Sequence, residues 1–291
     1  MTENGLQRMP NNKVLPTPTR FLNRLFMRPR QHQVTGDVRL GYVYNSKTIY
    51  GLSKRELTQH FLVVGRSGAG KTNVLRVMQI ELFRNDVPFL SFDIGKYGGR
   101  YIKHIIEPLI ILRWNKEFLF NFLFNPPGVN LKEWLMVFCS ILSEIFDIRP
   151  ASNLYLMKFI QNLFENLKTE YTGVYPNLHD LSDALEEKLK TKIPTNERGY
   201  INTLKSKIEP ICLILGDSIK VQKGIPIEKL LNYPVSIELV GIKSPLIQTW
   251  IMSMLLAWIT CYRESNKMGF GKLKHVFFLD EAHQVLSKGD S

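Results

Sequence analysis

The order of apolar and polar positions predicts an α/β protein. Short apolar runs, typical of buried strands, occur at residues 60–65, 87–92, 235–240 and 276–279. The stretches 72–84 and 245–263 are longer, largely apolar, and predict helices. Two strand–helix–strand units, one on each side of a long intervening region, predict a largely parallel sheet flanked by helices.

The intervening region, residues 102–232, is mostly helical in pattern. A breaker, Asn-Pro-Pro-Gly at 125–128, precedes its strongest helix candidate. We predict four helices here, at 131–148, 154–168, 177–190 and 200–215. No catalytic constellation stands out in the region, so we interpret it as a helical insertion or a lid.

The first 36 residues form a basic arm. They carry six Lys or Arg side chains against a single acidic residue, Glu3, and four prolines discourage a regular helix. We interpret the arm either as a solvated, flexible terminus or as a contact for DNA phosphates or a neighbouring subunit.

The stretch from Leu40 to Leu52 predicts a β-hairpin ahead of the first buried strand. Two β-rich runs flank the turn residues Asn45 and Ser46. Ser53 follows, and Glu56 three residues later completes a capping-box pattern for a short helix. We therefore divide the chain into a basic arm at 1–36, a hairpin with the first part of an α/β core at 37–101, the helical insertion at 102–232 and the second part of the core at 233–291.

Composition narrows the class of protein. Hydrophobic residues make up 44% and charged residues 22%, which is ordinary for a globular protein and excludes a disordered or collagen-like chain. The net charge of +12 favours an anionic partner without identifying it. The three cysteines, without CxxC spacing, and an N-terminus without an apolar signal segment favour a reduced, cytoplasmic compartment.

Residues 244–262 could form a membrane-spanning helix, because these 19 residues carry no charge. A spanning helix needs about 20 predominantly apolar residues. This stretch contains Gln248, Thr249, Ser253 and Thr260. We interpret it as a buried helix of a soluble domain, with a membrane segment as the alternative.

Residues 65–72 read Gly-Arg-Ser-Gly-Ala-Gly-Lys-Thr and match the phosphate-binding pattern G-x-x-x-x-G-K-[ST]. The loop lies between a predicted strand and a predicted helix, as this mechanism requires. Its glycines permit close backbone approach, and N–H groups of the loop and helix start surround phosphates. Lys71 is expected to reach the β- and γ-phosphates of ATP, and the Thr72 hydroxyl to ligate Mg²⁺.

Arg66 occupies a variable position of this loop and faces either solvent or a phosphate. The predicted nucleotide-binding residues are Gly65, Arg66, Ser67, Gly68, Ala69, Gly70, Lys71, Thr72 and Asn73.

A second motif, the Walker B pattern, is four apolar residues followed by Asp280 and Glu281. A buried strand would carry Asp280 to the carboxyl edge of the sheet, beside the phosphate-binding loop. Asp280 is expected to hold Mg²⁺, directly or through water. Glu281 is expected to orient or deprotonate the attacking water. Together with Lys71, which is expected to contact the β- and γ-phosphates, Glu281 is a predicted catalytic residue.

Three further polar residues follow predicted strands. Asp93 and Lys96 come after the second strand and belong either to the site or to a structural turn. His283 is either a packing residue or a group that couples to the γ-phosphate. No His, Cys or carboxylate spacing predicts a zinc site.

The spacing of the two motifs and the sequence around Asp280 argue against several classes of phosphate-loop protein. Lys71 and Asp280 are 209 residues apart, too far for AAA+ proteins or for the superfamily 2 helicases that share the string Asp-Glu-Ala-His. The ABC signature segment is missing before Asp280, and phosphate-loop kinases normally lack the Asp-Glu pair.

The chain resembles the HerA–FtsK superfamily, particularly the HerA-like (DUF87-type) ATPases, over about residues 38–291. The strings that carry this resemblance are HFLVVGRSGAGKTNVLRVM, PFLSFDIGKYGGRY, NPPGVNLKEWLMVF, PVSIELVGI and VFFLDEAHQVL. The resemblance implies a RecA-like P-loop NTPase fold, nucleotide binding at residues 65–72, and Mg²⁺ and water activation at Asp280 and Glu281. It also implies a hexameric ring that moves double-stranded DNA, with a partner nuclease.

Members of that superfamily continue well past Walker B, through further strands, a sensor and an arginine finger. Only ten residues follow Glu281 here, so we expect a truncated ATPase. An arginine finger contributes about 10³- to 10⁵-fold in rate, which puts efficient turnover of this chain in question. The alternatives are an ATPase of conjugation or type IV secretion machinery, and an ATP-binding regulatory protein without turnover.

Overall fold

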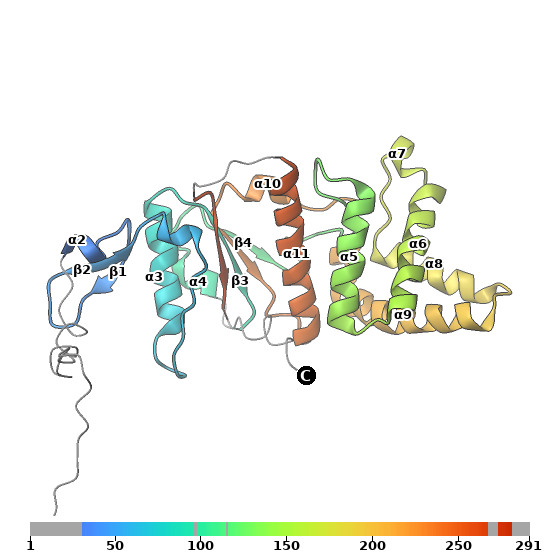
Figure 1. Cartoon of the computed structure of the whole chain (residues 1–291), viewed down its shortest axis with the longest axis horizontal. Helices are drawn as coiled ribbons and strands as arrows, with labels where there is room; N and C mark the ends of the chain where they lie inside the picture. The colour runs from blue at the N-terminus through green and yellow to red at the C-terminus, as the bar shows by residue number, and fades with distance from the viewer. Residues whose placement is uncertain (1–30, 96–97, 115, 267–272, 281–291) are drawn as a thin grey trace, which may run out of the picture.

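A computed structural model describes residues 31–95, 98–114, 116–266 and 273–280. A four-stranded parallel sheet lies at the centre, between α3 on one side and α11 on the other (Figure 1). A two-stranded hairpin lies outside α3, and a group of helices lies outside α11. The predicted α/β class is confirmed.

The sheet contains β3 (Phe89–Asp93), β4 (Ile110–Arg113), β5 (Val235–Glu238) and β6 (Val276–Leu279). Its order is β4-β5-β3-β6, and every pairing is parallel. Parallel strands place their carboxyl ends at one edge, so the residues that end or follow these strands meet there. The predicted strands at 87–92, 235–240 and 276–279 are confirmed: the first is shifted to 89–93, the second ends at 238, and the third has the predicted bounds.

Three helices cover the sheet where the site forms: α3 (Lys71–Arg84), α4 (Gly98–Ile102) and α11 (Pro245–Ser265). Within the described ranges, α11 alone is long and apolar enough to cross a membrane, but 56% of its most apolar window is buried. Trp250 and Trp258 of α11 are buried in the core between the sheet and the outer helices. This is the packing expected of the predicted core helix.

The hairpin consists of β1 (Val38–Tyr42) and β2 (Ile49–Leu52), which pair antiparallel with one irregularity after Arg39. A short helix, α2 (Gln31–Val34), contacts β2, so four residues of the predicted arm are helical; residues 1–30 lie outside the described residues. The capping-box hydrogen bonds of Ser53 and Glu56 are present, but only a three-residue 3₁₀ helix, η1 (Glu56–Thr58), follows them.

The predicted helical insertion packs beyond α11, away from α3, except for its last helix, which lies beside α11 on the sheet side (Figure 1). Its helices are α5 (Leu131–Phe146), α6 (Pro150–Asn166), α7 (Thr169–Thr172), α8 (Leu178–Lys190), α9 (Thr195–Leu215), η2 (Gly216–Ile219) and α10 (Ile227–Leu230). The four predicted helices are confirmed, and Asn177 caps α8 through a full capping box. None of these helices lines the cavity at the site.

One boundary of the insertion was wrong. Residues 110–113 were assigned to the helical region, but they form β4 and pair with β5 at the edge of the sheet. The run Ile-Ile-Leu-Arg is too short for its periodicity to distinguish a strand from a helix. Pairing with β5 across more than 120 residues decides its conformation.

The predicted buried strand at 60–65 was also wrong. The segment forms no strand, and the side chains of Phe61, Leu62 and Val64 are 49%, 71% and 77% exposed. An apolar run becomes a strand only where a neighbouring strand accepts its backbone hydrogen bonds. In the described part of the chain, no strand of the sheet pairs with residues 60–65.

Candidate functional site

The start of α3 forms the first part of the candidate site. Gly68 and Gly70 have φ angles of +76° and +91°, which L side chains rarely adopt, so this turn requires glycine at both positions. Gly70 precedes the first residue of α3, so the first N–H groups of the helix face the loop. The backbone therefore presents donors to an anion at this helix start.

The side chain of Lys71 lies over its own loop. Its Nζ donates hydrogen bonds to the carbonyl oxygens of Gly65 (2.8 Å) and Arg66 (3.2 Å). The ammonium group is thus held above the glycine turn by acceptors that a phosphate would replace. Arg66 and Asn73 are exposed.

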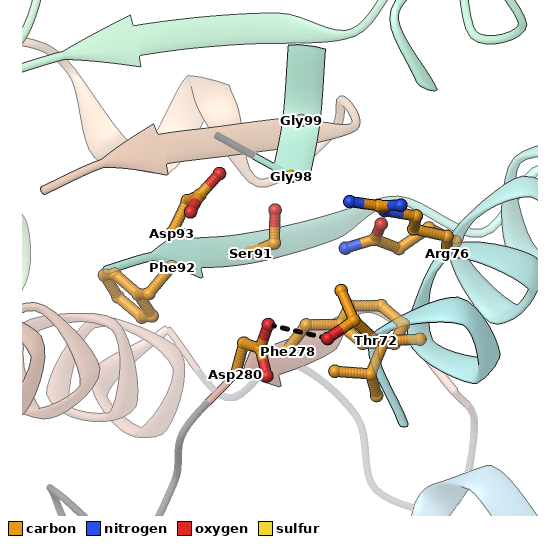
Figure 2. A pocket seen from close by; sticks show the side chains of 11 residues that line it. Thr72, Arg76, Ser91, Phe92, Asp93, Gly98, Gly99, Phe278 and Asp280 are labelled. Atoms are coloured by element: carbon orange, nitrogen blue, oxygen red, sulfur yellow. Dashed lines mark hydrogen bonds between the residues drawn. The ribbon is translucent and has the colours of Figure 1, made fainter. Parts of the chain in front are cut away.

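Thr72 and Asp280 bring the two predicted motifs together (Figure 2). The Thr72 hydroxyl donates to Oδ2 of Asp280 across 3.4 Å, and Asp280 directly follows β6. Mg²⁺ prefers oxygen ligands, and proteins commonly supply one or two side-chain oxygens beside substrate phosphates and water. A hydroxyl and a carboxylate at hydrogen-bonding distance therefore fit Mg²⁺.

A cavity of about 30 Å³ lies beside this pair, which is room for a water molecule. Its lining comes from α3, β3, the start of α4 and the end of β6: Thr72, Leu75, Arg76, Gln79, Ser91, Phe92, Asp93, Gly98, Gly99, Phe278 and Asp280. Asp93, a predicted candidate, is the last residue of β3 and is buried. Lys96, Glu281 and His283 lie outside the described residues.

Sequence reasoning missed two groups at this edge. Arg76 is four residues after Thr72, one helical turn along the same face of α3, and its guanidinium lies 4.5 Å from the ring centre of Tyr101 in α4. Its position on that face was a usable signal. Arg100 and Glu238 form an ion pair between α4 and the end of β5, with NH2 and Oε2 2.6 Å apart. Since 138 residues separate them, no local pattern could have indicated this pair.

A second ion pair lies at the carboxyl end of β4. Nε of Arg113 donates to Oε2 of Glu117 across 2.9 Å. This hydrogen bond is the main reason that the pKa of Glu117 falls to about 2, while burial opposes the shift. The pair is exposed and does not line the cavity.

The fold and these residues define a P-loop ATPase, with a parallel sheet whose carboxyl edge lies beside a glycine-rich helix start. Residues 38–259 match the model of the family described as "Helicase HerA, central domain" (DUF87). The match covers well over half of the chain, and the protein belongs to this family.

Two comparisons extend this assignment. The chain is 23% identical over 265 residues to the DNA double-strand break repair helicase HerA of Sulfolobus acidocaldarius, which covers 87% of this chain and 50% of that protein. The chain thus spans half the length of this curated relative. The structure is similar to that of VirB4 of Thermoanaerobacter pseudethanolicus, with a TM-score of 0.64, 11% identity, and coverage of 86% of this chain and 69% of the other. That likeness shows the fold alone.

Proposed function

We propose that this protein binds and hydrolyses ATP with Mg²⁺ and couples hydrolysis to the movement of double-stranded DNA. The observation that carries the proposal is the 3.4 Å approach of the Thr72 hydroxyl to the Asp280 carboxylate. It joins a phosphate-binding helix start to an acidic strand end, which is the arrangement that P-loop NTPases use.

Each part of the motif has a role in this proposal. The backbone N–H groups of residues 65–73 hold the phosphates, and Lys71 exchanges its loop carbonyls for phosphate oxygens. Thr72 and Asp280 would hold Mg²⁺, which neutralises charge on the phosphates when bound. Glu281 orients the attacking water and accepts its proton.

The DNA part rests on family and charge. The protein belongs to a helicase family, and its curated relative is named as a DNA double-strand break repair helicase. A net charge of +12 favours a polyanionic partner. We extend the proposal to a cytoplasmic protein that acts as a hexameric ring with a partner nuclease.

The test compares ATP binding and turnover of the full chain with those of Lys71→Ala. Wild-type protein should bind Mg·ATP and hydrolyse it faster with double-stranded DNA present. Lys71→Ala should lose at least tenfold in affinity, because removal of a charged hydrogen-bonding partner costs about 1.5–3 kcal/mol. Lys132→Ala is the control, since Lys132 is an exposed lysine of α5 that does not line the cavity.

Equal affinities of wild type and Lys71→Ala would contradict the nucleotide site. Binding without turnover, even with DNA, would contradict the motor function and leave the ATP-binding regulatory alternative. Glu281→Gln separates the two steps, because it should retain ATP binding and lose hydrolysis.

A further inference from the structure

Helix α4 closes one side of the cavity beside Thr72 and Asp280 (Figure 2). Its first two residues, Gly98 and Gly99, line that cavity. The next residue, Arg100, holds Glu238 in a two-pronged ion pair, with Nε to Oε1 at 2.7 Å and NH2 to Oε2 at 2.6 Å. The arginine of this ion pair is therefore the next residue in the chain after Gly99, which lines the cavity.

Glu238 belongs to a row of carboxylates at the sheet edge. It is 3% exposed, ends β5, and is in register with Asp93, which ends the neighbouring strand β3. Neighbouring strands are about 4.8 Å apart, so these two carboxylates end side by side. Asp280 follows β6, the next strand in the sheet, and lines the cavity together with Asp93. Acidic residues on three adjacent strands thus meet where the triphosphate would bind.

A buried carboxylate in this position requires a cation. An uncompensated Glu238 would be costly to bury and would repel an approaching phosphate. Arg113 of β4 is in register with Glu238, but its guanidinium is hydrogen-bonded to Glu117. In the described part of the chain, Arg100 is the cation that forms a salt bridge with Glu238.

We propose that Arg100 is a positioning residue that neutralises Glu238, so that Glu238 adds no uncompensated negative charge beside the triphosphate. This inference rests on the proposed ATP site. When Arg100 is removed, the unpaired Glu238 carboxylate should weaken ATP binding. When the charges of both Arg100 and Glu238 are removed, the ATP affinity should return close to that of wild type.

The experiment measures the dissociation constant for a fluorescent Mg·ATP analogue on the full chain, with circular dichroism and melting temperature for each variant. Arg100→Gln should raise the dissociation constant about tenfold, as expected for one uncompensated charge near the phosphates. The double variant Arg100→Gln/Glu238→Gln should return to within about threefold of wild type.

The matched control is Arg84→Gln. Arg84 pairs with Glu81 at the same 2.6 Å, and here too an exposed arginine holds a largely buried glutamate (64% and 11% exposed side chains). Arg84 ends α3, at the far end of the helix from Thr72. Its loss removes a comparable ion pair without adding charge at the site, so affinity should not change.

Arg100→Lys keeps the charge but not the two-pronged geometry, and should bind the nucleotide nearly as well as wild type. It remains informative if Arg100→Gln does not fold. Wild-type affinity in folded Arg100→Gln would overturn the inference. A double variant that binds as weakly as Arg100→Gln would identify a structural brace instead. A folded Arg100→Lys that binds as weakly as Arg100→Gln would do the same. Failure of the wild type to bind the analogue would refute the proposed ATP site itself.

Discussion

The Thr72 hydroxyl and the Asp280 carboxylate lie 3.4 Å apart although 208 residues separate them. Thr72 is fixed by the first turn of α3, and Asp280 by the end of β6, which pairs with β3. A helix start and a strand end therefore determine the distance. A site on such elements keeps its geometry before any ligand arrives.

The Thr72 hydroxyl should decide how strongly Mg²⁺ assists ATP binding. Thr72→Ala should lose about tenfold or more of the affinity that Mg²⁺ adds, since changes around a metal site typically cost 10- to 100-fold. Thr72→Ser keeps the oxygen and should stay close to wild type. Titration of a fluorescent ATP analogue with and without Mg²⁺ measures this effect. An unchanged Mg²⁺ dependence in Thr72→Ala would remove Thr72 from the site.

Gly99 should tolerate no side chain, because α4 lies against β5 there. A Cβ on Gly99 would lie 2.5 Å from Oγ and 2.7 Å from Cβ of Ser236, which is fully buried. Gly99→Ala should lower the free energy of unfolding by about 1–3 kcal/mol, as overpacking does. Urea denaturation measures the change. Gly95→Ala is the control, because its Cβ would meet no atom within 4 Å; equal effects would contradict the packing argument.

His275 should make the fold less stable in mild acid. It is 7% exposed, and neither ring nitrogen has a hydrogen-bond partner in the described part of the chain. Burial, assisted by the positive charge of Arg263, lowers its pKa to about 3. The unfolded chain, with a histidine pKa of about 6.5, binds the proton first, so stability falls as the pH drops from about 6.5 towards 3.

His275→Phe removes this titration. The free energy of unfolding of wild type, relative to the variant, should fall by about 1 kcal/mol between pH 6 and pH 5. Denaturant unfolding at the two pH values measures this difference. A difference that does not depend on pH would show that His275 does not titrate as a buried, neutral group.

The basic arm should contribute to DNA binding through phosphates. Deletion of residues 1–30 removes six basic side chains and one acidic one. The dependence of DNA affinity on salt should become less steep, because fewer counterions are released on binding. Fluorescence anisotropy with labelled double-stranded DNA at several salt concentrations measures the slope. An equal slope in the shortened chain would leave the arm as a solvated terminus; ATP affinity serves as the control for folding.

Elements with a strong local signal were predictable. The capping box at Asn177 starts α8, and the apolar run predicted at 87–92 contains most of β3, which is buried at every position. The glycine turn before Lys71 was also identifiable, because only glycine readily adopts its positive φ angles. In each case the information lies within a few residues.

Two apolar runs show where local information ends. Residues 60–65 have the pattern of a strand and are exposed without one, while residues 110–113 were assigned to helical sequence and form β4. A strand satisfies its backbone through a neighbour, and the sequence of the run does not say whether that neighbour is present. Whether an apolar run becomes a strand of the sheet therefore depends on whether another strand of the fold lies beside it.

The sequence by itself determined the class of protein, because the G-x-x-x-x-G-K-[ST] pattern at residues 65–72 and the acidic end of the last apolar run each lie within a few contiguous residues. Only the tertiary structure decided which distant side chains join them. Arg100 meets Glu238, and α4 closes the cavity, because β3 and β5 are adjacent in the sheet and place their carboxyl ends together. Pairing across more than 100 residues is a property of the whole fold, and local pattern does not encode it.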